Sequence, residues 1–169
     1  MSPPWPAQRV AVLVDTDNLY HAARRLHGRR IDYGRLLAHV VGGRALARAL
    51  AYVLRAEDVD VRPFLEVLAQ VGFELRVKTA WRTPEGGSRA AWHVGLALEA
   101  AALASKVDVV VLVAGDGAYA DLGAVVRAAG ARLEVAAVPG SVAEALAQGA
   151  DEVRTLDDPS LWRPERPIA

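Results

Sequence analysis

Short apolar runs alternate with longer segments of mixed polarity along most of this chain. The runs are rich in β-branched residues or alternate between apolar and polar positions, which is typical of strands. They predict strands at residues 9–14, 45–54, 73–80, 109–113 and 133–138, with an edge strand at 153–156. Apolar positions at helical spacing predict helices at residues 18–26, 33–40, 61–71, 90–105 and 119–129, and a short helix capped by Ser141. The alanines of residues 45–54 leave a helix as the alternative there.

Strands that alternate with helices of roughly ten residues indicate βαβ units and a parallel sheet. We therefore expect an α/β fold, a three-layer α/β/α sandwich with a mainly parallel sheet. Asp17 and Asp32 are the expected N-caps of the first two helices. Residues 82–88, rich in Gly, Pro and Ser, are the expected flexible loop. The proline-rich tail from Pro159 onward is expected to be loosely attached.

Two aspartates directly follow two of the predicted buried strands. Asp15 comes after residues 9–14, and Asp116 lies in a Gly-Asp-Gly segment soon after residues 109–113. The carboxyl ends of parallel strands meet at one edge of a sheet, where ligands of α/β proteins bind. Carboxylate oxygens are ligands that Mg²⁺ and Mn²⁺ prefer. The sequence therefore predicts a divalent-metal site formed by these two side chains.

Composition narrows the class of protein. At 169 residues the chain is expected to form one main domain with a core of its own. It has no cysteine, which excludes disulfides, zinc–thiolate sites and thiol nucleophiles. The start lacks the apolar stretch of a secretory signal, and the apolar runs are far shorter than the ~20 residues of a membrane span. We expect a cytoplasmic protein without membrane contact.

Charge is balanced overall but unevenly distributed. Residues 1–89 carry 14 basic and 9 acidic side chains, whereas residues 90–169 carry 6 basic and 11 acidic ones. Such asymmetry indicates a surface that faces a polyanion and an acidic pocket, or else a chance distribution over solvated helix faces. Four arginines close to the Asp15 segment are candidates for nucleic-acid binding. They are Arg24, Arg25, Arg29 and Arg30.

The segment Val-Asp-Thr-Asp-Asn-Leu-Tyr at residues 14–20 resembles the opening motif of NYN domains, the PIN-like nuclease relatives that include the LabA-like proteins. In that motif a strand ends in Asp, here Asp15, and Asn follows three positions later, here Asn18. A second block at residues 111–122 resembles the family's strand running into Ser-Gly-Asp-x-Asp-Phe, with Asp116 at the first aspartate and Tyr119 at the aromatic position. Residues 64–77 and 127–156 resemble further units of the family. The similarity predicts an NYN domain at residues 9–157, followed by the tail at 158–169.

Two family positions differ in this chain. The second aspartate of the Gly-Asp-x-Asp block is Ala118, and a carboxylate position on the preceding helix is His93. The next carboxylate position on that helix is Glu99, and the family's basic position falls beside Arg89. The resemblance thus implies a set of three carboxylates, Asp15, Glu99 and Asp116, with one ligand missing.

The resemblance implies hydrolysis of RNA phosphodiester bonds by carboxylate-bound Mg²⁺ or Mn²⁺. Asp15, Asp116 and Glu99 would hold the metal, and Asn18 would hold the attacking water or a phosphate oxygen. Accessory roles fall to His93, Asp17 and Asp121, and RNA binding to the four arginines named above together with Arg89. A depleted, one-metal site is the form that the missing carboxylate suggests.

Two alternatives remain open from the sequence. A PIN-like domain with a depleted site would bind RNA or protein without cutting, and Trp162 in the tail would then anchor a partner or a second copy of the chain. Asp15-Thr-Asp17 and Asp116 with Asp121 also resemble motifs of haloacid-dehalogenase-type phosphatases. In such an enzyme Asp15 would accept the phosphoryl group and Asp17 would be the general acid.

Overall fold

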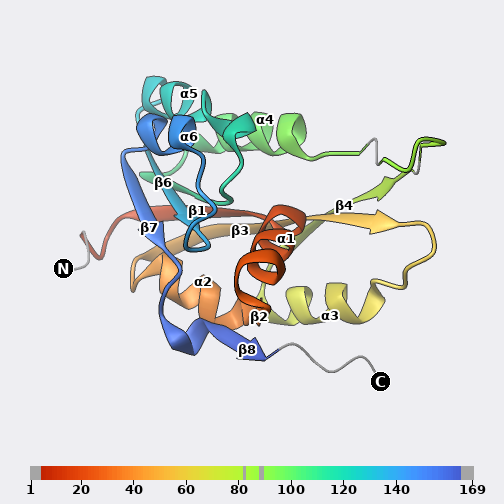
Figure 1. The fold of residues 1–169 in the computed structure, drawn as a ribbon. Coiled ribbons are helices and arrows are strands. Elements are labelled where there is room, and N and C mark those ends of the chain that lie inside the picture. Colours follow the sequence, from red (N-terminus) through yellow and green to blue (C-terminus); the bar gives the residue numbers. More distant parts are fainter. Residues whose placement is uncertain (1–4, 82, 88–89, 165–169) are drawn as a thin grey trace.

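A six-stranded sheet forms the centre of the computed structural model, which describes residues 5–81, 83–87 and 90–164 (Figure 1). Every neighbouring pair in this sheet is parallel, and the strand order is β4-β3-β1-β5-β6-β7. The strands are β1 (Arg9–Asp15), β3 (Ala45–Ala56), β4 (Glu74–Ala80), β5 (Val109–Val113), β6 (Arg132–Ala137) and β7 (Glu152–Thr155). The expected parallel sheet is confirmed.

Helices cover both faces of the sheet. In Figure 1, α4 (His93–Ala104), α5 (Leu122–Ala128) and α6 (Glu144–Gly149) lie above it, and α2 (Tyr33–Val41) and α3 (Arg62–Val71) lie below. The lower core contains Val10, Val12 and Val14 of β1 together with residues of α1 (Thr16–His27), whereas the upper core contains Ala11 and Leu13. Alternate side chains of one strand thus enter opposite cores, as a central strand of a three-layer sandwich requires.

The chain reverses its direction across the sheet between β1 and β5. From β1 it moves outward through β3 to β4, then returns to place β5 on the other side of β1 and continues to β6 and β7. Val14 lies opposite Val113 in this central pair, so both strands end at the same edge. A reversal of this kind opens a crevice at the carboxyl ends of the two strands, which is the usual ligand site of open α/β sheets.

A second, two-stranded sheet joins distant parts of the chain. The strand β2 (Arg29–Ile31) pairs antiparallel with β8 (Trp162–Pro164), which follows the short helix η2 (Pro159–Leu161). Leu161 is buried in the lower core. We expected a tail that is loosely attached from Pro159, but residues 159–164 pack against the domain because β2 offers them a partner strand.

Several helix boundaries differ from the expected ones. The first helix begins at Thr16, and its N-cap is Asp15 rather than Asp17, because Asp15 Oδ1 accepts the Asn18 N–H at 3.1 Å. The expected helix at 119–129 is divided into the 3₁₀ turn η1 (Gly117–Tyr119) and α5. The last helix follows Ala143, not Ser141. Within the part of the chain that is described, no helix has the length and apolar character needed to cross a bilayer.

Candidate functional site

Asp15 lies at the carboxyl end of β1 and is buried, with 5% of its surface exposed. Its Oδ2 accepts a hydrogen bond of 2.7 Å from the Tyr119 hydroxyl. Burial raises the pKa of Asp15, although the hydrogen bonds from Tyr119 and the Asn18 N–H oppose that shift. Burial and the nearby Asp15 also raise the pKa of Tyr119, so its hydroxyl keeps its proton and acts as the donor.

Asn18 connects the two strand ends. It lies in the first turn of α1, and its Oδ1 accepts the N–H of Gly115 at 2.9 Å. Gly115 directly precedes Asp116 in the turn between β5 and η1. The asparagine side chain therefore fixes the turn that carries one aspartate relative to the helix that begins at the other.

Asp116 faces the crevice and is more accessible than Asp15. Its Oδ1 accepts the Ala118 N–H, and its Oδ2 lies 2.9 Å from His93 Nε2 on α4. The side chains of Asp116 and His93 are 36% and 38% exposed. The His93 ring packs edge-to-face on the Tyr119 ring at 5.2 Å between centroids. Asp15, Tyr119, His93 and Asp116 therefore form one contiguous cluster across the β1–β5 crevice.

Backbone contacts hold the turn of Asp116 in place. A Cβ atom at Gly115 would lie 2.4 Å from the carbonyl oxygen of Ser141, so only glycine fits at this position. The Gly115 carbonyl also accepts the N–H of Ala143 at 2.8 Å. The loop that follows β6 therefore packs directly behind Asp116 and orients its carboxylate.

Glu99, the third expected carboxylate, is occupied by other partners. Its two oxygens accept hydrogen bonds from Arg76 Nε at 3.1 Å and Nη2 at 2.6 Å, and from the Tyr52 hydroxyl at 2.7 Å. Arg48 lies 3.8 Å away. Burial would raise the pKa of Glu99, but the bonds from Arg76 and Tyr52 outweigh burial and lower it. The structure thus places Glu99 in an ion-pair network with strands β3 and β4.

The fit to a metal ion rests on two carboxylates. No three His, Asp or Glu side chains among residues 5–81, 83–87 and 90–164 are arranged to hold a metal ion together. The expected set of Asp15, Glu99 and Asp116 is therefore not assembled. Mg²⁺ is commonly held by only one or two carboxylates, with water and substrate phosphate completing its shell. The oxygens of Asp15 and Asp116 suit this simpler form of site.

The other candidate residues from the sequence lie outside the Asp15–Tyr119–His93–Asp116 cluster. Asp17 is partly buried, and its carboxylate lies 3.4 Å from His21. Asp121 precedes α5 and lines an apolar groove of about 330 Å³ together with His93 and Ala118. Arg24 donates to the Tyr20 hydroxyl, and Arg25 is exposed on the same helix.

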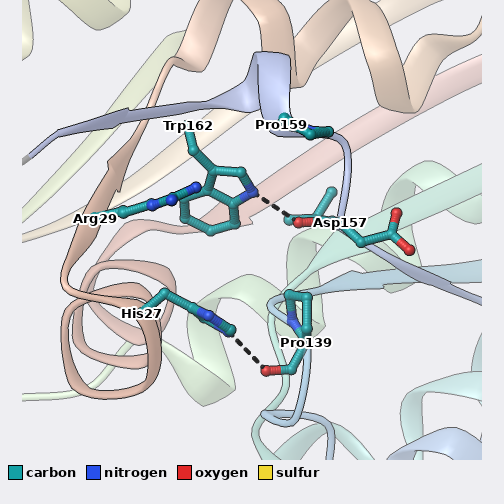
Figure 2. Close-up of a pocket in the computed structure, with 7 residues that line it drawn as sticks. His27, Arg29, Pro139, Asp157, Pro159 and Trp162 are labelled. Atoms are coloured by element: carbon teal, nitrogen blue, oxygen red, sulfur yellow. Dashed lines mark hydrogen bonds between the residues drawn. The ribbon is translucent and has the colours of Figure 1, made fainter.

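Arg29 and Arg30 belong to β2, a strand that the sequence analysis did not predict. Arg89 lies outside the described residues. Figure 2 shows a small cavity of about 160 Å³ beside β2, with Arg29, His27 and Trp162 on its walls. The Trp162 indole donates to the Leu156 carbonyl at 2.9 Å, and its ring lies 6.0 Å from that of His27. Trp162, expected as a partner anchor, makes these contacts within its own chain.

Tyr119, Tyr52 and Arg76 are the residues of this region that the sequence analysis did not select. Tyr119 was matched to an aromatic family position, and its place three residues after Asp116 was the signal for its role. Tyr52 and Arg76 carry no comparable signal in the sequence. Both bind Glu99, from which they are separated by 47 and 23 positions in the chain.

Comparison with known families agrees with this geometry. The family model described as NYN domain matches residues 9–157, which include both aspartates and every strand of the large sheet. The chain belongs to the NYN domain family. NYN domains generally have a PIN-like nuclease fold.

One solved structure is similar to this NYN protein over nearly its whole length. It is a crystal structure of a protein of unknown function from Vibrio parahaemolyticus, with a TM-score of 0.82, 29% identity and coverage of 92% of this chain and 97% of that chain. A ribokinase from Giardia lamblia is a more distant match, with a TM-score of 0.47, 13% identity and coverage of 89% of this chain and 57% of that chain. No curated protein gives a significant match.

Proposed function

We propose that this NYN protein is a divalent-metal-dependent endoribonuclease whose site is the crevice between β1 and β5. The observation that supports this most directly is the placement of Asp15 at the end of β1 and of Asp116 in the turn after the adjacent parallel strand β5, at the reversal point of the sheet. Asn18 ties the two ends together, and Tyr119 and His93 fill the space between them. The opening motif at residues 14–20 supports assignment to the LabA-like group.

Asp15 and Asp116 are the residues that would hold Mg²⁺ or Mn²⁺. When bound, the ion would neutralise charge on the scissile phosphate and lower the pKa of a bound water. Glu99 has no part in this proposal, because its charge is already paired with the guanidinium group of Arg76, and Arg48 lies 3.8 Å away.

The protein side chains supply orientation and proton transfer. The Tyr119 hydroxyl holds the Asp15 carboxylate in one orientation through its 2.7 Å hydrogen bond. His93 is half-exposed and touches Asp116, so its Nε2 is placed to exchange a proton with a ligand in the crevice. Helix α1 begins at Thr16, directly after Asp15, and the backbone N–H groups of its first turn favour a phosphate there. RNA is the substrate class that these features and the family suggest, and we therefore prefer a nuclease to the phosphatase alternative.

Cleavage of a fluorescent single-stranded RNA in Mn²⁺ tests this proposal. Asp116→Asn keeps the shape of the side chain but removes its charge, and we expect the cleavage rate to fall by roughly two orders of magnitude or more. Glu99→Gln is the matched control, and we expect it to cleave within about threefold of the wild-type rate.

Excess EDTA should stop the wild-type protein as well. Cleavage that persists in EDTA or in Asp116→Asn would contradict the mechanism. RNA binding without cleavage under all conditions would favour the binding-only alternative, which exposed Ala118 at the position of a family carboxylate supports.

A further inference from the structure

A large cleft opens beside the proposed nuclease site. It has a volume of about 580 Å³ and is lined by residues of α1, β2, α3 and the carboxyl end of β3, among them Thr16 and Asp17, which directly follow Asp15. In Figure 1, α1, β2 and α3 lie at the lower side of the sheet, with α1 in front. Its size is typical of clefts that bind small organic groups. Two of its lining residues thus directly follow Asp15 in the chain. None of the four residues of the Asp15–Tyr119–His93–Asp116 cluster lines the cleft.

The walls of the cleft are mainly apolar and aromatic. Leu19, Val53 and Phe64 contribute to them, and the Tyr33 ring packs edge-on against Phe64 at 5.4 Å between centroids. Tyr20 and Val59, which are about half-exposed, contribute the rest of the apolar surface that faces solvent. A flat, weakly polar group such as a nucleobase is the kind of ligand that a surface of this composition accommodates.

Two arginines without a carboxylate partner among the described residues border this apolar surface. Arg29 and Arg30 both line the cleft. Within the described part of the chain, neither guanidinium group has a carboxylate partner, and Arg30 Nε is buried with no hydrogen-bond acceptor. The carboxylate of Asp17, which also lines the cleft, lies close to His21 instead. Since the guanidinium charge of Arg30 at this surface has no carboxylate partner among the described residues, the cleft is suited to a ligand that brings an anionic group.

We propose that this cleft binds one unpaired nucleotide of an RNA single strand, with the base against the apolar wall and a neighbouring phosphate on Arg30. This inference rests on the proposed function, because it places the strand next to the cleavage site. Bases of an RNA duplex are stacked and paired, so only a single-stranded segment can insert a base here. The cleft therefore selects single-stranded over double-stranded substrates.

Fluorescence anisotropy in EDTA tests binding apart from cleavage. The probes are a fluorescein-labelled 12-nucleotide oligo(U), the same strand annealed to oligo(A), and unlabelled UMP as competitor. We expect the single strand to bind and the duplex to bind at least about tenfold more weakly. Arg30→Gln should weaken binding of the single strand about tenfold and reduce the slope of log K against log[salt] by about 0.7.

Two further variants make the outcome specific to the cleft. Val59→Asp places a carboxylate at an exposed lining position, so it should weaken binding about tenfold without disturbing the core. Arg132→Gln is the matched control. Arg132 lies at the amino end of β6, whereas the cleft lies at the carboxyl end of β3, and its side chain is 54% exposed. It should bind oligo(U) as the wild-type protein does.

Each result decides between the two proposals. Wild-type affinity in both Arg30→Gln and Val59→Asp, equal affinity for the duplex, or no binding of oligo(U) at all would overturn the inference. Competition by UMP at the same concentration of nucleotide would assign the cleft to free nucleotides instead. Weakened binding in the cleft variants of a protein that never cleaves would contradict the nuclease proposal alone, whereas cleavage lost in Asp116→Asn with unaltered cleft variants would contradict this inference alone.

Discussion

At the scale of the residue, the buried carboxylate of Asp15 affects both the proposed function and the free energy of unfolding. Burial raises its pKa above the ordinary value of 3.8, so ionisation of Asp15 opposes folding. The stability that its protonated form contributes is fully present below pH 3.8 and is lost as the pH rises through the higher pKa of the folded protein. The native charge at this site therefore lowers the stability of the protein at neutral pH.

Asp15→Asn removes that ionisation while keeping a side chain that caps α1. We expect the variant to have a higher free energy of unfolding than the wild type at pH 7.5, with the difference disappearing at pH values below 3.8. Urea denaturation at several pH values measures this. A variant less stable than the wild type at neutral pH would show instead that the hydrogen bonds from Tyr119 and Asn18 matter more than burial. Loss of cleavage in a stabilised variant would assign that loss to chemistry rather than to unfolding.

At the scale of the element, the two short helices α5 and α6 pack closely against each other. A Cβ atom at Gly123 of α5 would lie 1.9 Å from the Gly149 carbonyl oxygen of α6, and one at Gly149 would lie 2.5 Å from that of Ala120. Backbone thus meets backbone, and neither helix can accept a side chain at the contact.

Gly123→Ala should therefore lower the free energy of unfolding by about 2–3 kcal/mol or more, because the helices must separate. Gly34→Ala in α2 is the control, since a Cβ there makes only ordinary contacts of 3.4 Å or longer. It should be neutral or stabilise by up to about 1 kcal/mol, because alanine favours a helix over glycine. Thermal and urea unfolding of both variants measures the difference, and equal effects of the two would contradict the packing argument.

One buried ion pair links both halves of the sheet at the scale of the whole molecule. Arg44, just before β3, donates to both carboxylate oxygens of Glu134 on β6 at 2.9 Å, and both residues are at least 95% buried. Arg44 also donates to the carbonyls of Val40 and Val41 at the end of α2. Arg154 on β7 lies 3.3 Å from Glu134. The pair therefore joins strands that are separated by β1 and β5.

Arg44→Met leaves Glu134 buried with Arg154 as its remaining ionic partner. We expect a loss of about 3–5 kcal/mol in the free energy of unfolding, as for other buried pairs that lose one member. The double variant Arg44→Met, Glu134→Leu should recover much of that loss, because no charge is then left without its partner. Urea unfolding measures both, and a loss below about 1 kcal/mol in the single variant would show that water reaches Glu134.

Much of the fold could be predicted because it is recorded in local patterns. Residues 10–14 and 109–113 are buried and form continuous apolar runs, which is how central parallel strands differ from edge strands. Residues 45–54 were ambiguous because alanine favours helices. This segment forms a strand because its backbone hydrogen-bonds to β1 on one side and to β4 on the other. That pairing is a tertiary effect.

The sequence by itself determined the fold class, the family and the position of Asp15 and Asp116 at strand ends, because each depends on residues close together in the chain. Only the tertiary structure decided the partners of the remaining site residues. Glu99 lies on a predicted helix, yet Arg76 and Tyr52 on neighbouring strands take both of its oxygens. Likewise, β2 exists only because β8, more than 130 residues later, supplies its hydrogen bonds. Such contacts depend on which strands become neighbours, and local hydropathy carries no record of that choice.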